Sequence, residues 1–192
     1  MQNFNPQQFL SQMGYTNELK GNINLDALKI RPARIEDSFF MNELRIMDGV
    51  FENCPSVYSE RISFSQNMIN GLSGESDHMF VAEAFMENRV VILGIAGLHV
   101  NKNPRMKHSA TIGILVHTAY QGKGIGKKLM DKVIDLADNW LLLKRIELEV
   151  ISDNIPAINL YKKYGFTQEG IKKYCVIKNG KYMDAVLMAR YK

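Results

Sequence analysis

The most distinctive part of the chain is Tyr120-Gln121-Gly122-Lys123-Gly124-Ile125-Gly126-Lys127-Lys128-Leu129, which lies between an apolar run at 112–116 and a long amphipathic segment. Three glycines on alternate positions remove the β-carbons that would hold an anionic ligand away from the backbone. The helix expected after the stretch directs its unpaired N–H groups and the positive end of its dipole at the same place. The stretch therefore predicts a phosphate-binding loop, with an ordinary glycine-rich turn before a helix as the alternative.

Two familiar phosphate-binding patterns do not fit this stretch. A P-loop needs glycine at position 121 and serine or threonine at position 128, where the chain has Gln121 and Lys128. The G-x-G-x-x-G pattern of dinucleotide-binding proteins and kinases needs a third glycine where Lys127 or Leu129 stands. What remains is Q-x-x-G-x-G, which resembles the coenzyme A (CoA) pyrophosphate loop of the GNAT superfamily of N-acetyltransferases.

The composition favours a globular domain of modest positive charge. The chain has 192 residues, of which 46% are apolar, and a formal net charge of +4. This is enough for one domain with a substantial core. Lysines gather at 123–128 and at 162–173, where a polyanion such as CoA could bind, although a solvated lysine surface is the simpler alternative. Nucleic acid is not expected as a partner, because no nucleic-acid motif accompanies the lysines.

Cysteine usage and hydropathy predict a cytoplasmic protein. Cys54 and Cys175 form no spacing motif and are expected to be free thiols in a reducing compartment. No apolar run approaches the length of a membrane span, and the first residues lack the pattern of a signal peptide, so no membrane partner is expected. The four histidines are scattered without metal-ligand spacing, which predicts no metal site.

Hydrophobic periodicity predicts an arm followed by one domain. Residues 1–26 are expected to form an N-terminal arm, helical or disordered, and residues 27–192 the domain. The predicted elements of the domain, in chain order, are a strand at 28–32, a helix beginning at Asp37, a helix at 59–72, strands at 79–85, 90–100 and 108–116, a helix at 123–140, a strand at 145–150, a helix at 154–164, and strands at 166–177 and 182–191. Turns are expected at Glu87-Asn88-Arg89 and, as a two-residue hairpin loop, at Asn179-Gly180. Trp140 falls on the apolar face of the helix at 123–140 together with Ile125 and Leu129, so it is expected to be buried.

The element order β-α-α-β-β-β-α-β-α-β-β resembles the GNAT fold from about residue 28 to the end of the chain. This resemblance implies an α/β fold of α+β layers, with a mixed central sheet of six to seven strands flanked by helices. The match therefore covers most of the chain and is not confined to one loop.

The strand predicted at 145–150 carries two carboxylates on one face. Polar and apolar residues alternate along it, so Glu147 and Glu149 point to the same side. A strand in the middle of an α/β sheet is usually apolar on both faces. The two carboxylates therefore indicate a wet cleft, with a strand face that meets solvent or pairs with lysines as the alternative.

The helix predicted at 154–164 presents an amide and a phenol along one stripe. Asn154 suits its N-cap and Pro156 its first turn, and Tyr161 stands about two turns after Asn154. A linear ligand could run along both side chains, although aromatic residues at helical spacing usually belong to a core. The motif N-x-x-A-x-x-x-Y, followed by Tyr164-Gly165-Phe166, resembles the second GNAT signature.

The GNAT resemblance assigns roles to these residues. It implies that Asn154 contacts the pantetheine arm of CoA and that Tyr161 is the general acid that protonates the CoA sulfur. As in some members of the family, Glu149 would be the general base, whereas other members deprotonate the amine through a water chain. The backbone N–H of Val116 would stabilise the acyl oxygen. The CoA contacts implied in this way are Ile114, Leu115, Val116, Gln121, Gly122, Lys123, Gly124, Ile125, Gly126, Lys127, Asn154 and Ala157.

The acceptor pocket implied by the resemblance lies between the first two helices and the last hairpin. Its polar candidates are Glu52, Tyr58, Arg61, Tyr182 and Asp184. A carboxylate among them could hold a substrate ammonium group, and Arg61 could hold a carboxylate.

The sequence thus predicts direct transfer of an acetyl group from acetyl-CoA to the primary amine of a small molecule, and the resemblance to bacterial family members favours a free amino acid. The alternatives are a protein N-terminal or lysine acetyltransferase and a non-catalytic, acyl-CoA-binding regulatory module. Family members are often dimers, so a homodimer that pairs through the last hairpin is a further expectation.

Overall fold

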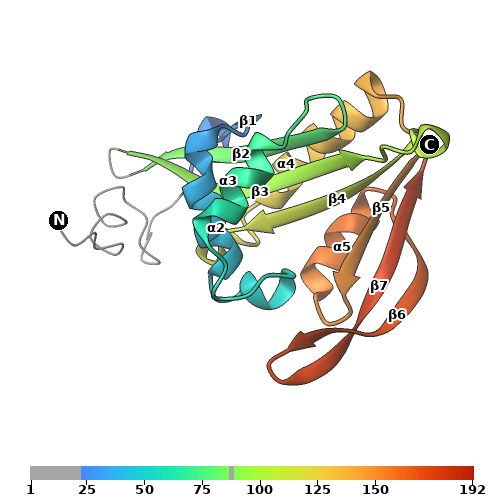
Figure 1. Ribbon diagram of the computed structural model, residues 1–192. Helices are drawn as coiled ribbons and strands as arrows, with labels where there is room; N and C mark the ends of the chain where they lie inside the picture. The colour runs from blue at the N-terminus through green and yellow to red at the C-terminus, as the bar shows by residue number, and fades with distance from the viewer. Residues whose placement is uncertain (1–22, 87–88) are drawn as a thin grey trace.

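A seven-stranded sheet lies at the centre of the fold, with its strands in the order β1-β2-β3-β4-β5-β7-β6 (Figure 1). The computed structural model describes residues 23–86 and 89–192. The strands are β1 (Lys29–Pro32), β2 (Asp77–Met86), β3 (Arg89–Val100), β4 (Ser109–Val116), β5 (Arg145–Ile151), β6 (Thr167–Lys178) and β7 (Lys181–Tyr191). β4 and β5 run parallel, and the other neighbouring strands are antiparallel. This mixed sheet and its flanking helices confirm the layered α+β fold that the sequence predicts.

Helices and short turns connect the strands. The α-helices are α2 (Ser38–Ile46), α3 (Ile62–Asn70), α4 (Ile125–Asp135) and α5 (Ile155–Lys163). The shorter elements are the 3-10 turns η1 (Leu25–Ala27), η2 (Ile35–Asp37), η3 (Phe51–Asn53), η4 (Pro104–Met106) and η5 (Thr118–Tyr120), and the π turn η6 (Leu136–Trp140). The predicted arm up to residue 22 and the turn predicted at Glu87-Asn88 lie outside the described residues.

β4 and β5 separate after a short contact. Their parallel pairing joins Ser109–Thr111 to Arg145–Glu147. Beyond it, β4 stays paired with β3 up to Val116, and β5 stays paired with β7 up to Ile151. The two strands therefore splay apart toward their carboxyl ends, as Figure 1 shows.

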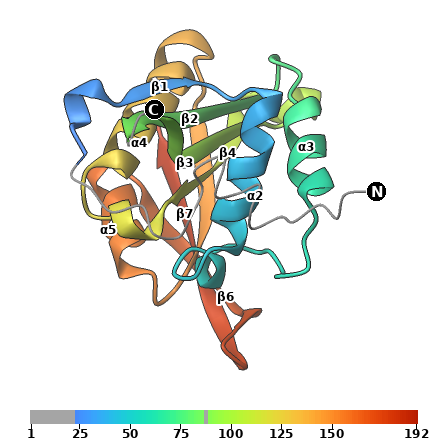
Figure 2. The same ribbon diagram turned by 90° about the vertical axis from the view of Figure 1, so that its left-hand side faces the viewer.

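The helices form one layer on each face of the sheet (Figure 2). α2 and α3 cover one face, where Met41, Leu44 and Ile69 belong to one apolar cluster. α4 and α5 cover the other face, where Leu129 and Ile158 belong to a larger cluster. Because successive side chains of a strand point to opposite faces, β2 and β3 contribute to both clusters.

The segment predicted as one helix at 123–140 forms two different helical elements. α4 begins directly after Gly124, which has a left-handed backbone (φ 89°), and it is followed by η6. In this wider π turn the N–H of Leu141 donates to the carbonyl of Leu136 at 3.0 Å. The turn rotates Trp140 off the apolar stripe, and its side chain is 74% exposed. The prediction that Trp140 lies on the buried face is therefore wrong.

The last two strands confirm the predicted hairpin loop. Lys178 pairs with Lys181, so Asn179-Gly180 forms the two-residue connection. These two residues have φ angles of 50° and 73°, as the tight turns that suit a twisted hairpin require. The hairpin extends beyond the body of the protein (Figure 2).

A buried ion-pair network fixes the start of α2 against the sheet. Arg31 on β1 donates two hydrogen bonds to Asp37, at 2.7 and 2.9 Å, and one to Glu83 on β2, at 2.5 Å. Asp37 is buried and also accepts from the N–H of Arg34 at 2.7 Å. The network therefore holds η2, and with it the first turn of α2, on β1 and β2.

Replacing Arg31 by methionine should destabilise the protein by about 3 kcal/mol, because Asp37 would keep a buried charge without its main partner. Urea denaturation followed by circular dichroism measures the loss. Lys173→Met is the control, since it removes an exposed ion pair with Asp184 and should leave the denaturation midpoint unchanged. An Arg31→Met protein as stable as the wild type would show that this network does not anchor α2.

Candidate active site

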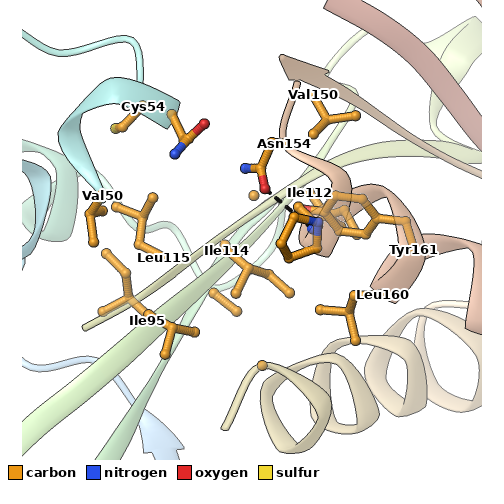
Figure 3. Close-up of a pocket in the computed structure, with 18 of the residues that line it drawn as sticks. Val50, Cys54, Ile95, Ile112, Ile114, Leu115, Val150, Asn154, Leu160 and Tyr161 are labelled. Atoms are coloured by element: carbon orange, nitrogen blue, oxygen red, sulfur yellow. Dashed lines mark hydrogen bonds between the residues drawn. The ribbon is translucent and has the colours of Figure 1, made fainter. Parts of the chain in front are cut away.

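A cavity of about 630 Å³ lies where β4 and β5 separate (Figure 3). Its lining comes from α2, η3 and α3 on one side, from the glycine-rich loop, α4 and α5 on the other, and from the strands between them. The site residues predicted from the sequence that the structure brings together here are Ile114, Leu115, Val116, Gln121, Gly122, Gly124, Gly126, Lys127, Glu149, Asn154, Ala157 and Tyr161.

The glycine-rich loop has a backbone that side chains would obstruct. Gly122 and Gly124 have φ angles of +71° and +89°, which residues with a β-carbon rarely adopt. A β-carbon on Gly126 would lie 3.3 Å from Leu160 of α5. The first two glycines therefore shape the loop, and the third lets α4 and α5 approach each other.

The first turn of α4 leaves three N–H groups for a ligand. Lys128 makes the first intrahelical hydrogen bond, to the carbonyl of Gly124 at 3.1 Å. The N–H groups of Ile125, Gly126 and Lys127 consequently have no partner within the helix. Together with the positive end of the helix dipole, they suit a phosphate group.

Three side chains of the loop have partners within the protein. Gln121 Nε2 donates to the carbonyl of Val116 at 3.1 Å and so ties the loop to β4. Lys123 Nζ lies 4.7 Å from the centre of the Tyr120 ring, and Ile125 is buried in the core. Lys123 and Ile125 are the two predicted CoA contacts that do not line the cavity.

The edge of β4 presents backbone N–H groups to the cavity. The N–H of His117 donates to the carbonyl of Leu93 on β3 at 2.9 Å. Alternate residues of an antiparallel pair face away from the partner strand, so the N–H groups of Ile114 and Val116 point into the gap left by β5. A linear ligand in this gap can therefore bind β4 as a neighbouring strand would.

α5 brings Asn154 and Tyr161 to the cavity, as Figure 3 shows. Asn154 caps the helix, its Oδ1 accepting from the N–H of Ala157 at 3.3 Å, which leaves its amide NH₂ for a ligand. Tyr161 is 7% exposed, and its ring packs near that of Phe166. Burial raises the pKa of Tyr161 to about 12, so the phenol keeps its proton at neutral pH and can act as a proton donor.

Glu149 reaches the cavity from β5 but is engaged by a lysine. Its two carboxylate oxygens lie 3.3 and 3.2 Å from Lys172 Nζ on β6, and its side chain is 53% exposed. Glu147, on the same face of β5, pairs with Arg145 at 2.8 Å. Both carboxylates of this strand therefore have cationic partners.

The acceptor residues predicted from the sequence do not line the cavity; they are Glu52, Tyr58, Arg61, Tyr182 and Asp184. Glu52 accepts from the N–H of Gly49 at 2.7 Å, and Asp184 pairs with Lys173 at 2.8 Å. Tyr58, Arg61 and Tyr182 are exposed. The part of these residues in acceptor binding stays a prediction.

The side of the cavity formed by α2, η3 and α3 with β2 and β3 is built from residues that the sequence did not single out. They are Met41, Val50, Cys54, Met68, Met79 and Ile95, which are apolar, and Arg45, Asn53 and His99, which are polar. Arg45 could have been recognised as unusual from the sequence. It follows Met41 by four residues and so shares the buried side of α2, where a charge is unexpected.

Arg45 is a buried cation at this side of the cavity. Its Nε and Nη2 donate to Glu60 at 2.6 and 3.1 Å, and its guanidinium lies 4.9 Å from the centre of the Phe64 ring. Arg45 is 9% exposed, and no described residue hydrogen bonds to its Nη1. Burial lowers the pKa of Arg45, but the hydrogen bond to Glu60 and the nearby Cys54 and Glu60 raise it by more. The pKa of Arg45 is therefore raised. This side of the cavity therefore carries a fixed, charged donor.

The described part of the chain holds neither a metal cluster nor a membrane-spanning helix. In residues 23–86 and 89–192, no group of three or more His, Cys, Asp or Glu side chains is arranged to hold a metal ion. Across those same residues, no helix has both the length and the apolar character needed to cross a membrane.

Comparison with known proteins identifies the family. The model of the Acetyltransferase (GNAT) family matches residues 43–166. The L-amino acid N-acetyltransferase AaaT of Escherichia coli (strain K12) is 45% identical over 101 residues, which are 53% of this chain and 62% of that protein. The spermidine N(1)-acetyltransferase of the same strain is 26% identical over 166 residues, 84% of each chain. The crystal structure of spermidine N-acetyltransferase from Vibrio cholerae in complex with CoA and spermine has a TM-score of 0.73 and 25% identity, and the match covers 86% of this chain and 96% of that one.

The matches to the family model and to the amino acid acetyltransferase cover different shares of the proteins. The chain spans less than two thirds of the length of the amino acid acetyltransferase, so the similarity to that protein does not transfer its activity. The family model, in contrast, covers well over half of the chain and contains the glycine-rich loop, the β4 edge and the motif on α5. The protein belongs to the GNAT acetyltransferase family.

Proposed function

We propose that the protein transfers the acetyl group of acetyl-CoA to the amine of a free amino acid with an apolar side chain. The observation that carries this proposal is Arg45, a fixed guanidinium in a wall otherwise made mainly of methionine and aliphatic side chains. Its Nη1 makes no hydrogen bond to any described residue. Guanidinium groups bind carboxylates with matched geometry and charge. Arg45 would hold the carboxylate of the amino acid while Met41, Met68 and Met79 contact its side chain.

The loop side of the cavity suits acetyl-CoA as the acyl donor. The N–H groups at the start of α4 would bind the pyrophosphate, as the unpaired donors and the helix dipole favour. The N–H groups of Ile114 and Val116 and the amide of Asn154 would bind the pantetheine arm. The similar structure from Vibrio cholerae is a complex with CoA and spermine, which supports a CoA site on this fold.

The reaction needs two groups that move protons. The acceptor ammonium must lose a proton before its nitrogen can attack, and the departing thiolate must gain one. Tyr161, protonated and buried beside the cavity, would supply the second proton. Glu149 is the base that the family resemblance implies. Negative charge on the acyl oxygen would be stabilised by a β4 N–H group that points into the gap, that of Val116 or of Ile114.

A polyamine acceptor fits the cavity less well. A polyamine carries several ammonium groups, and carboxylates would be needed to balance them. Glu149 is the one acidic side chain among the described residues that line the cavity, and Lys172 already pairs with it. The Escherichia coli relative named for L-amino acids supports the same choice.

The cellular location, the oligomeric state and the partners of the protein stay proposals. Cys54 and Cys175 are free, which suits a reducing compartment and supports the cytoplasm as its location. The homodimer, and the absence of nucleic-acid and membrane partners, stay predictions from the sequence.

Thiol release from acetyl-CoA tests the proposal when it is measured against free amino acids, polyamines and short peptides, with mass spectrometry of the products. Turnover of apolar amino acids supports it. Turnover of polyamines or peptides alone would contradict the assigned acceptor, and tight acetyl-CoA binding without any turnover would indicate a binding role.

Tyr161→Phe should lower kcat about 100-fold, because the thiolate would depart without its proton donor. The KM for acetyl-CoA should stay close to that of the wild type, since the ring remains in place. Tyr174→Phe, which changes an exposed tyrosine outside the cavity, is the control. Normal turnover by the Tyr161→Phe enzyme would remove this residue from the mechanism.

Gly124→Ala should weaken acetyl-CoA binding about tenfold, because a side chain in a left-handed backbone costs about 1–2 kcal/mol and the loop would relax from its binding shape. Isothermal titration calorimetry measures the affinity. Gly180→Ala places the same methyl group at another positive φ angle, in the distant hairpin loop, and should leave the affinity unchanged. Equal affinities for the two variants would argue against a phosphate site at the loop.

The double variant Arg45→Gln/Glu60→Gln should lose the preference for an amino acid over the same amine without its carboxylate. Changing both partners avoids leaving Glu60 as a lone buried charge. The ratio of kcat/KM for phenylalanine and phenethylamine should fall about 30-fold, as expected for loss of a charge-assisted hydrogen bond. An unchanged ratio would mean that Arg45 does not bind the carboxylate.

A further inference from the structure

His99 and Asp77 form a hydrogen-bonded pair at the cavity that the mechanism above does not use. His99 lies on β3 and lines the cavity, and its Nδ1 is 3.0 Å from Asp77 Oδ1. Asp77 is its direct cross-strand partner on β2. The histidine side chain is 40% exposed, so protons can exchange between it and solvent.

Asp77 determines which nitrogen of the imidazole carries the proton. An ionised carboxylate only accepts hydrogen bonds, so Nδ1 is the donor and, in the neutral ring, Nε2 has the free lone pair. Ser76 Oγ and Lys102 Nζ hold the other oxygen of Asp77, at 2.8 and 2.9 Å. Burial alone would raise the pKa of Asp77, but its hydrogen bonds to His99, Lys102 and Ser76 lower it to about 2. The carboxylate therefore stays charged at neutral pH.

The free nitrogen of His99 lies over an open part of the cavity floor. Nε2 is 3.0 Å from the place that a β-carbon on Gly97 would occupy, and Gly97 lines the same cavity. Gly113 is the cross-strand partner of Gly97, and its β-carbon position has no other atom within 4 Å. Two facing glycines thus leave space for a substrate amine or a water molecule beside Nε2, and no described residue hydrogen bonds to this atom.

The other charged groups around His99 already have partners. On the side of β5, Glu147 pairs with Arg145, and next to Asp77 lies Lys102. Within the cavity, Arg45 pairs with Glu60 and Glu149 with Lys172. A proton taken up by Glu149 would weaken its ion pair, whereas a proton taken up at His99 Nε2 adds to the existing bond with Asp77.

We propose that His99 is the general base that deprotonates the acceptor amine and that Asp77 is its positioning residue, an inference that rests on the proposed function. One proton passes from the ammonium group to Nε2, directly or through one water. The neutral nitrogen then forms the C–N bond, and the C–S bond breaks as the sulfur takes the Tyr161 proton. The second proton of the nitrogen restores the Tyr161 phenol, and the imidazolium releases its proton to solvent.

The test compares kcat over a range of pH for the wild type, His99→Gln, Glu149→Gln and Asp77→Asn, with phenylalanine as the acceptor. The kcat of the wild type should rise with pH as the catalytic base loses its proton. His99→Gln should lose this limb and about 100-fold of kcat while it keeps its affinity for acetyl-CoA. Asp77→Asn should lower kcat as well, because an amide can donate to Nδ1 and so move the ring proton to Nε2. His108→Gln, an exposed histidine outside the cavity, is the control.

Two further measurements separate a base from a structural residue. Imidazole added to the His99→Ala enzyme should restore part of its turnover, which a purely structural role would not allow. In the wild type bound to CoA, addition of phenylalanine should shift the NMR signal of the His99 ring, and this measurement needs no variant to fold.

The outcomes distinguish the two proposals. A wild type that acetylates amino acids, with a His99→Gln enzyme of unchanged kcat and pH profile or a His99 signal unmoved by phenylalanine, would overturn the role of His99. Loss of the pH limb in Glu149→Gln alone would assign the base to Glu149. A wild type without turnover on any amine would refute the proposed function, and the base with it.

Discussion

The separation of β4 and β5 is the constraint on which the rest of the site depends. A sheet normally uses all its backbone groups in pairing, but here the parallel contact ends at Thr111 and Glu147. From that point the edge of β4 faces a gap, and every wall of the cavity is arranged around it. The parallel pairing itself requires a crossover, which α4 supplies, and the crossover begins with the glycine-rich loop. One topological feature therefore places an open strand edge and a helix N-terminus side by side.

The two sides of the cavity have different physical origins. The loop side comes from contiguous segments, the glycine-rich loop with α4 and the first two turns of α5, in which local backbone geometry fixes the binding groups. The side proposed for the acceptor combines side chains from α2, η3, α3, β2 and β3, which lie far apart in the sequence. Only the packing of α2 and α3 on the sheet brings these together, and the ion-pair network of Arg31 holds α2 in that position.

Three charged groups at or beside the cavity are engaged in ion pairs, and this decides which groups remain for chemistry. Arg45, Glu147 and Glu149 each have a partner of opposite charge. Tyr161, which burial keeps protonated, and His99, whose proton Asp77 fixes on Nδ1, face the cavity as a donor and an acceptor. The favoured proton donor and acceptor therefore lie on opposite faces of the sheet, with the gap between β4 and β5 separating them.

The element order, the mixed sheet, the Asn179-Gly180 hairpin and the position of the glycine-rich loop before α4 follow from the sequence alone. They depend on periodicity, turn chemistry and motifs whose residues are neighbours in the chain. The predicted burial of Trp140 is wrong, since the π turn η6 changes the rotation about the helix axis per residue. Nothing in the local composition indicates such a turn. Arg45 and His99 could not be recognised as candidate site residues from the sequence. Their possible roles depend on their partners Glu60 and Asp77, which are 15 and 22 residues away in the chain. The side proposed for the acceptor becomes visible only in the folded chain, since cross-strand register and helix docking determine which distant side chains share a cavity.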